Sequence, residues 1–218
     1  MTPRFTSLAD LACSEREAAT PVAFARAGDR EQAVEFADWG RDVARVRAAL
    51  RRAGARGGAR VALYDEDPYA FAVGLFGAWH AGCLVVLPPN AQPGSLARLR
   101  GTVASAIGGD GGWLPGTLGI APLGDAAEER ASSDGEPVGL APLDREALAL
   151  ELFTSGTTGE GRIATKRLRH LDDEVAVLER TFGAAVAGAR VYATASHQHL
   201  YGLLFRVLWP LCAGRAFH

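Results

Sequence analysis

Residues 150–166 read LELFTSGTTGEGRIATK, and the stretch changes abruptly from apolar to hydroxyl-rich residues. The apolar run 148–153 is typical of a buried strand. It ends in TSGTTG at residues 154–159, which places four hydroxyls and two glycines in six positions. Glycine allows backbone turns that are closed to other residues and lets a ligand approach the main chain. We therefore interpret the stretch as a strand that ends in a ligand-binding loop.

Polyphosphate is the ligand that this loop favours. Successive main-chain N–H groups in such a turn form a concave anion site, and Ser and Thr hydroxyls add donors. Arg162 and Lys166 follow with positive charge. A tight turn without a ligand is the alternative. The residues that we expect to bind phosphate are Thr154, Ser155, Gly156, Thr157, Thr158, Gly159 and Arg162.

Two other phosphate-binding loops fit the stretch less well. A Walker loop needs four residues between its first glycine and a Gly-Lys-Ser/Thr ending, whereas Gly156 and Gly159 are three positions apart and no Gly-Lys follows. Gly159, Gly161 and Ala164 satisfy the loose dinucleotide-binding pattern. That fingerprint also needs an acidic residue at the end of the next strand, and the expected strand 190–194 offers none. The dinucleotide interpretation stays open only as an alternative.

The loop at residues 154–159 resembles the signature loop of the adenylate-forming superfamily, which includes acyl-CoA synthetases, luciferases and the adenylation domains of peptide synthetases. In that family the loop continues with any residue, then proline, then lysine. Here the three positions hold Glu160, Gly161 and Arg162. Arginine keeps the positive charge, and its planar fork suits phosphate. We therefore expect phosphate binding to survive the change, whereas the loss of proline affects the rigidity of the loop.

The resemblance implies an enzyme that uses ATP and Mg²⁺ to activate a carboxylic acid. The acid attacks the α-phosphorus of ATP, which gives an acyl-adenylate and pyrophosphate, and the thiol of CoA or an acyl carrier protein then takes the acyl group. By the same resemblance His199 is a catalytic-site residue, on the wall between the acyl pocket and the phosphate end. A histidine paired within its own loop is the alternative.

The rest of the chain alternates apolar strands with helices. Strand, helix and strand recur with short connections, which predicts a parallel sheet with right-handed crossovers. The fold class is therefore α/β, with mostly parallel β-sheets flanked by helices, and the resemblance makes it part of the large N-terminal domain of an adenylate-forming enzyme. We expect strands at 21–26, 60–64, 83–87, 148–153 and 190–195, and helices at 8–19, 36–50, 69–81, 92–106, 168–182 and 203–211. In the helix 168–182 the apolar spacing predicts a buried face with Leu171, Val175, Leu178 and Phe182, and the acidic run 172–174 is expected on a solvated face.

We divide the chain into two parts at residue 147. Residues 1–147 are expected to form an N-terminal α/β subdomain, in which the segment 108–147 is loop-rich because glycines and prolines interrupt it. Residues 148–218 are expected to hold the phosphate-loop strand, the helix after it and the start of a second subdomain.

The resemblance runs over essentially the whole chain, yet family members are more than twice as long. Their adenine-binding segment, metal-binding glutamate, ribose-binding aspartate and catalytic lysine would lie beyond His218, and Lys166 is too close to the loop to replace that lysine. We therefore expect a truncated or split ligase whose remaining site residues come from a second chain. The alternative is a catalytically incomplete module that binds nucleotide or a partner. Three runs further resemble carrier-protein ligases of aryl-polyene pigment pathways: 79–82, 88–91 and 166–168.

Composition excludes several classes of function. With a net charge of −2, the chain lacks the basic footprint of a nucleic-acid-binding protein. No apolar run approaches the ~18 residues of a membrane span, and the N-terminus lacks the apolar core of a signal peptide. The three cysteines, Cys13, Cys83 and Cys212, are scattered, which is typical of idle thiols in a reducing cytoplasm.

No metal-binding residues are predicted. The acidic run Asp65-Glu66-Asp67 directly precedes Pro68, a favoured first helical residue, so we interpret it as helix-capping. His197 and His199 are two positions apart, but no third ligand accompanies them. By the same resemblance, Mg²⁺ would bridge the phosphates of ATP.

Overall fold

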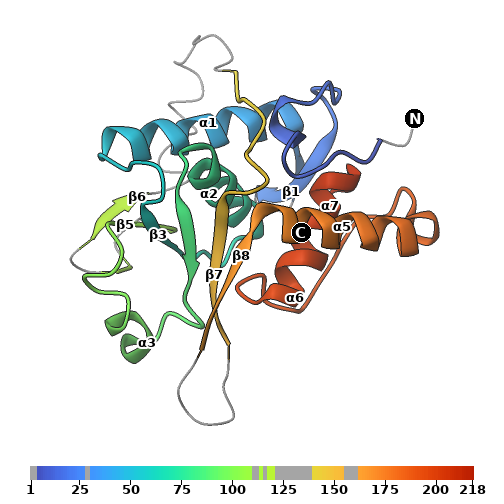
Figure 1. Cartoon of the computed structure of the whole chain (residues 1–218). Coiled ribbons are helices and arrows are strands. Elements are labelled where there is room, and N and C mark those ends of the chain that lie inside the picture. The colour runs from blue at the N-terminus through green and yellow to red at the C-terminus, as the bar shows by residue number, and fades with distance from the viewer. Residues whose placement is uncertain (1–3, 28–29, 110–112, 115–116, 121–138, 155–161) are drawn as a thin grey trace.

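A six-stranded sheet with the order β6-β5-β3-β4-β7-β8 forms the centre of the molecule (Figure 1). The computed structural model describes residues 4–27, 30–109, 113–114, 117–120, 139–154 and 162–218. Five strands run parallel, and β8 pairs antiparallel with β7. This confirms the predicted α/β class with a mostly parallel sheet. The strands are β3 (Arg60–Leu63), β4 (Leu84–Leu87), β5 (Ser105–Ile107), β6 (Leu118–Ile120), β7 (Leu148–Thr154) and β8 (Arg162–Arg167).

Both faces of the sheet are buried, as expected for parallel strands covered by helices. On one face, alternate residues such as Val61 and Val85 join a core with α1 (Phe36–Arg52) and α2 (Pro68–His80). On the other face, Ala62 and Val86 pack with Leu96 in α3 (Pro93–Ala97). The alternation follows from the two-residue period of a strand.

The helix α2 lies in the middle of the larger core because nearly every side chain from Tyr69 to Trp79 is apolar and buried. Its start is fixed by Asp67, whose carboxylate accepts a hydrogen bond from the Ala70 amide at 2.7 Å, which confirms the predicted helix cap. A methyl group on Gly77 would lie 2.5 Å from Val46 Cγ1. The glycine therefore allows α1 and α2 to pack closely.

A second, two-stranded sheet connects the two ends of the chain. β1 (Pro21–Ala27) pairs antiparallel with β2 (Arg30–Glu35), and Phe217 forms bridges to Ala23 and Val191. The C-terminal half is helical: α5 (Leu168–Phe182), η2 (Gly183–Val186), α6 (Leu200–Gly202), η3 (Leu203–Leu208) and α7 (Trp209–Ala213). None of the helices in the described ranges is long and apolar enough to span a membrane.

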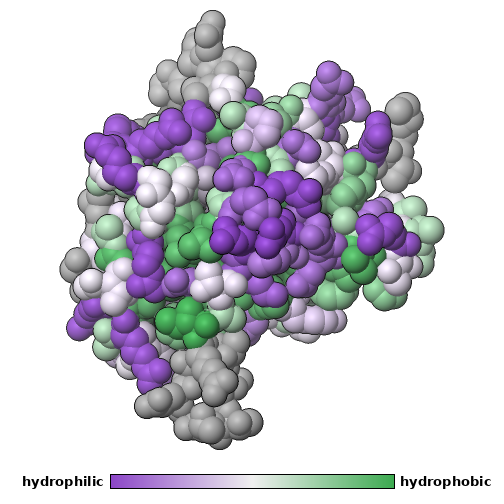
Figure 2. Space-filling model, viewed as in Figure 1, coloured by the Kyte–Doolittle hydropathy of each residue, from purple (hydrophilic) through white to green (hydrophobic). Residues whose placement is uncertain are grey.

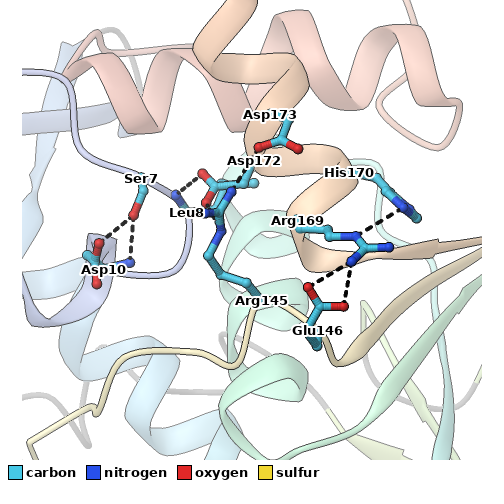
Figure 3. Close-up of polar contacts among 9 residues, drawn as sticks. All are labelled: Ser7, Leu8, Asp10, Arg145, Glu146, Arg169, His170, Asp172 and Asp173. Atoms are coloured by element: carbon cyan, nitrogen blue, oxygen red, sulfur yellow. Dashed lines mark hydrogen bonds and ion pairs between the residues drawn. The ribbon is translucent and has the colours of Figure 1, made fainter.

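Charged residues fix the start of α5 against the segment that leads into β7 (Figure 3). Arg145 contacts Asp172 at 3.2 Å and Asp173 at 2.8 Å, and Arg169 contacts Glu146 at 2.8 Å. The Asp172 carboxylate also accepts a hydrogen bond from the Leu8 amide at 2.8 Å. Hydrophilic residues accordingly gather over this part of the surface (Figure 2).

Four of the predicted elements differ from those observed, and the strands β2, β5, β6 and β8 are not predicted at all. The expected helix 8–19 is only the three-residue turn η1 (Leu11–Cys13), because Ser7 and Asp10 bond locally and compete with a helix. The expected helix 92–106 stops after α3; Gly101 adopts a φ of 72° beyond it, and Ser105 starts β5. The expected strand 190–195 contributes only the bridge at Val191.

The fourth difference concerns α5, whose predicted buried and solvated faces need correction. Its bounds agree with the expected helix 168–182, and Leu171 and Val175 are buried as predicted. Phe182, expected on the buried face, is 48% exposed, whereas Asp172, expected on the solvated face, is only 4% exposed. The helix is rotated so that Asp172 meets Arg145 and the Leu8 amide, a contact distant in sequence.

Candidate functional site

The expected phosphate-binding loop connects two paired strands at one edge of the sheet. Thr154, the last residue of β7, lies opposite Arg162, the first residue of β8. Residues 155–161, which include Ser155, Gly156, Thr157, Thr158 and Gly159, lie outside the described part of the chain, as do the side chains of Thr154 and Arg162. The structure therefore places the two ends of the loop, and the phosphate-binding role of its residues stays a prediction.

This edge is where ligands bind in open α/β sheets, outside the carboxyl ends of the strands. β4 and β7 end on the lower side of Figure 1, and α6 lies on the same side. Asp65 lies two residues beyond Leu63, the last residue of β3, so it belongs to the same edge.

The main-chain oxygen of Asp65 joins two distant loops. It accepts hydrogen bonds from the His197 ring nitrogen Nε2 and from the Gln198 side-chain amide, each at 2.8 Å. Both side chains are buried, and the His197 ring packs against Phe71 with 4.6 Å between ring centroids. Two side-chain hydrogen bonds to one main-chain oxygen thus hold the segment before α6 against the residues that follow β3.

The Asp65 carboxylate fixes a third loop at the same edge. It accepts hydrogen bonds from the Asp67 amide at 3.0 Å and the Gly109 amide at 2.8 Å. Burial raises the pKa of Asp65, and the two amides oppose that shift. Gly108 is needed beside it because its φ is 138° and a Cβ there would lie 1.6 Å from the Tyr64 oxygen.

His197 is held as a neutral ring in one tautomer. Because its partner is a carbonyl oxygen, Nε2 must carry the proton, which leaves Nδ1 as an acceptor. Burial lowers the pKa of His197, which favours the neutral ring. Within the described residues, neither His197 Nδ1 nor Gln198 Oε1 has a hydrogen-bond partner. Two buried acceptors can therefore receive N–H or O–H groups at this edge.

His199, the expected catalytic-site residue, has an exposed side chain at the start of α6. Its main chain is fixed by the Ser196 oxygen at 3.2 Å and by the Leu203 amide at 2.8 Å. Gly202 lets this turn close on the helix, because a Cβ there would lie 2.0 Å from the Ser196 oxygen. No hydrogen bond, ion pair or ring contact among the described residues joins the His199 side chain to β7 or β8.

A cavity of about 440 Å³ lies between the segment 186–195 and the helical run 201–209. Arg206 lines it, and burial lowers the pKa of this guanidinium. His199 does not line the cavity. Its principal apolar and aromatic lining residues are Val191, Tyr192, Tyr201, Phe205 and Trp209.

Sequence reasoning missed the polar cluster formed by Asp65, His197 and Gln198. Asp65 was attributed to helix capping, and His197 was considered only as a metal ligand. In the described ranges no group of three or more His, Cys, Asp or Glu side chains could hold a metal ion. The available signal was the polar pair His197-Gln198 directly before an apolar helix, but its partner is 132 positions away in the sequence.

Comparison with solved structures identifies enzymes that share this fold. The fatty acyl-adenylate ligase from L. pneumophila, solved with acyl adenylate and pyrophosphate, superposes with a TM-score of 0.75 over 97% of this chain at 16% identity. An acyl-CoA synthetase from Brucella canis gives a TM-score of 0.71 over 98% of this chain at 17% identity. The o-succinylbenzoate CoA synthetase from Bacillus subtilis, bound to its acyl-adenylate intermediate, gives 0.67 over 85% at 17% identity.

The chain spans less than half of these enzymes, namely 39%, 42% and 49% of their respective lengths. The sequence matches no protein-family model and no curated protein. The similarity therefore defines a fold class: this chain has the α/β fold found in a portion of adenylate-forming acyl ligases.

Proposed function

We propose that this chain forms the phosphate-binding part of an AMP-forming acid–thiol ligase. The observation that carries the proposal is the position of the TSGTTG stretch, between β7 and β8 at the carboxyl edge of a sheet whose fold is that of acyl-adenylate ligases. The reaction would join a carboxylic acid to ATP and then transfer the acyl group to the thiol of CoA or an acyl carrier protein. ATP consumption suits a cytoplasmic location.

The proposed first step breaks the bond between the α- and β-phosphates of ATP. A carboxylate oxygen of the acid attacks the α-phosphorus, pyrophosphate leaves, and the products are an acyl-adenylate and pyrophosphate. In the second step the thiolate attacks the acyl carbonyl carbon, and AMP leaves. Such phosphoryl chemistry depends mostly on positioning and on stabilising charge.

The chain's own contribution is to stabilise the leaving pyrophosphate. Donors that are already aimed at developing charge give the largest electrostatic benefit. The loop amides and the hydroxyls of Ser155, Thr157 and Thr158 would donate to the β- and γ-phosphates, and Arg162 would add charge. The donor set fits a polyphosphate, and Mg²⁺ would be carried mainly by phosphate oxygens, as is usual for this ion.

His199 is proposed to separate the acyl pocket from the phosphate end. Its exposed side chain, on a main chain fixed at both ends, is compatible with a residue that meets a ligand. The two-part division at residue 147 and the contribution of site residues by a second chain are also part of this proposal.

Pyrophosphate–ATP exchange tests the proposal directly. The chain, alone and together with a polypeptide that supplies the remaining ligase fold, is assayed with a panel of carboxylic acids. Exchange that depends on an acid and is lost in Thr157→Val, but kept in the control Thr165→Val on β8, supports the ligase. Absence of exchange under every condition contradicts it.

A nucleotide-binding module without turnover is the second candidate, favoured by Gly161 and Arg162, which stand where the resembling loop has proline and lysine. Calorimetry with ATP distinguishes the two. Binding of ATP that Thr157→Val weakens, without exchange in any combination, supports the module over the ligase.

A further inference from the structure

A second cavity, of about 310 Å³, lies at the amino ends of β4 and β7. It is at the opposite edge of the sheet from Thr154, because β7 runs away from it for seven residues, or about 20 Å. α1, the end of α2 and the segment 139–147 come together at this edge (Figure 1). The cavity is therefore separate from the candidate phosphate site.

The rim of the cavity carries two arginines from one face of α1. Arg47 and Arg51 are four positions apart, so they lie one helical turn from each other. Neither makes an ion pair with any residue that the structure describes. Arg51 Nη2 donates only to the main-chain oxygen of His80, at 3.4 Å. The rim thus holds two positive charges, neither of which forms an ion pair with a residue that the structure describes.

His80 shows the effect of these charges on the cavity. His80 is half-buried, and its Nε2 atom is buried without a hydrogen-bond partner within the described residues. Burial, followed by the charges of Arg47 and Arg51, lowers the pKa of His80 to about 4. The ring is therefore neutral at physiological pH, and the two arginines add to the effect of burial in lowering its pKa.

The remaining wall is mostly apolar. The indole N–H of Trp79 already donates to the Ala149 oxygen at 2.9 Å, so the ring offers hydrocarbon to the cavity. Asp144 brings the one carboxylate of the lining, and it accepts a hydrogen bond from the Glu146 amide at 2.9 Å. Two arginines and one aspartate leave a net charge of +1. The other apolar lining residues include Cys83, Leu143, Leu148 and Leu168.

We propose that this cavity binds a small monocarboxylate whose apolar body lies against Trp79 and whose carboxylate is held by Arg47 and Arg51. The arginine fork matches a carboxylate, and the net charge favours a single negative charge over a polyphosphate. The volume lies at the lower end of the ~300–1,000 Å³ range of ligand pockets, which restricts the body to about one ring or a short chain. The inference does not depend on the proposed ligase activity.

Benzoate tests the proposal, with benzamide as its neutral isostere and inorganic phosphate as a compact anion. Calorimetry measures affinity in the absence of nucleotide, and NMR of the histidine rings follows the titration of His80. Benzoate is expected to bind and to raise the pKa of His80 by about one unit, since a carboxylate offsets the nearby arginines. Benzamide and phosphate are expected to bind at least about tenfold more weakly, because each lacks one of the two recognised features.

Variants on α1 provide matched controls. Arg47→Gln and Arg51→Gln are each expected to weaken benzoate binding about tenfold or more, because each removes a charge-assisted hydrogen bond. Arg52→Gln changes an exposed arginine of the same helix that does not line the cavity, and it is expected to leave the affinity within about twofold of wild type.

Three results would overturn the inference. The first is equal affinity for benzoate and benzamide, which removes the role of charge. The second is equal affinity for benzoate and phosphate, which removes the role of the apolar wall. The third is unchanged His80 titration with folded protein at millimolar benzoate.

Discussion

His197 Nε2 lies 2.8 Å from the main-chain oxygen of Asp65, although the two residues are 132 positions apart in the sequence. Gln198 donates to the same oxygen at 2.8 Å. One carbonyl at the end of β3 therefore positions the segment before α6. This contact therefore fixes the position of the segment 196–199 relative to the carboxyl ends of the strands, where β7 leads into the proposed phosphate-binding loop.

Replacing His197 tests how much this contact stabilises the fold. His197→Ala removes a buried hydrogen bond and the ring that packs on Phe71, so we expect the free energy of unfolding to fall by about 2 kcal/mol. Denaturant unfolding measures the change. His199→Ala, at an exposed neighbour, serves as control and is expected to change stability by less than about 0.5 kcal/mol. Equal effects of the two variants would contradict the assigned role of His197.

Among the charged residues of the C-terminal half, Glu179 is expected to be the one whose replacement lowers the stability of the fold most. It contacts Arg215 at 2.7 Å and 3.0 Å and accepts a hydrogen bond from the Trp209 indole at 2.7 Å. The Arg215 side chain is only 6% exposed, so Glu179→Gln leaves a buried charge without its counter-charge and should cost about 3 kcal/mol. Thermal unfolding measures the loss, and Glu174→Gln on the same helix is the control.

The ion pair between Glu179 and Arg215 is expected to make the stability of the fold depend on pH. The hydrogen bonds from Arg215, opposed by burial, lower the pKa of Glu179 below its ordinary value of 4.5. Its contribution to stability is therefore present above pH 4.5 and is lost as the pH falls through the folded-state pKa. A Glu179→Gln variant whose stability falls as steeply as that of the wild type in this acid range would contradict the assignment.

His80 is expected to make the stability of the fold depend on pH in a second, higher range. Its pKa falls from 6.5 to about 4 in the folded chain, so the unfolded chain takes up a proton first as the pH decreases. Stability is therefore complete above pH 6.5 and declines towards pH 4, by up to about 3 kcal/mol. Denaturant midpoints across this range measure the decline. The slope should disappear in His80→Gln; an unchanged slope would assign it to other groups.

Replacing glycine by alanine is expected to lower the stability of the fold at one position and to raise it at another. Gly202→Ala places a methyl group 2.0 Å from the Ser196 oxygen, so the turn at 196–199 must move and stability should fall by about 2 kcal/mol. Gly40, inside α1, has no atom within 4 Å of a built Cβ. Gly40→Ala should therefore raise stability by up to about 1 kcal/mol, because alanine favours helix. Calorimetric melting of both variants checks the contrast.

Long periodic segments were predictable from the sequence. α1, α2 and α5 follow their apolar patterns, and the alternation of strands with helices predicted the mostly parallel sheet. The expected helix 92–106 failed because composition alone does not show that the chain turns at Gly101 and joins the sheet at Ser105.

The candidate site was predictable only in part. The TSGTTG stretch stands out by its local composition, and the strand predicted directly before it is β7, which ends at Thr154. The cluster of Asp65, His197 and Gln198 was not predictable, because its contacts join loops that only the tertiary fold brings together. The buried position of Asp172 has the same origin, since its partner is the amide of Leu8.

The amide resonances of residues 155–161, followed while MgATP is added to the chain, test the central claim most directly. The account predicts that these resonances move in a saturable way and that Thr157→Val weakens the apparent affinity about tenfold or more, whereas Thr165→Val leaves it unchanged. Resonances that stay in place at saturating nucleotide would contradict the assignment of the β7–β8 connection as a phosphate-binding loop.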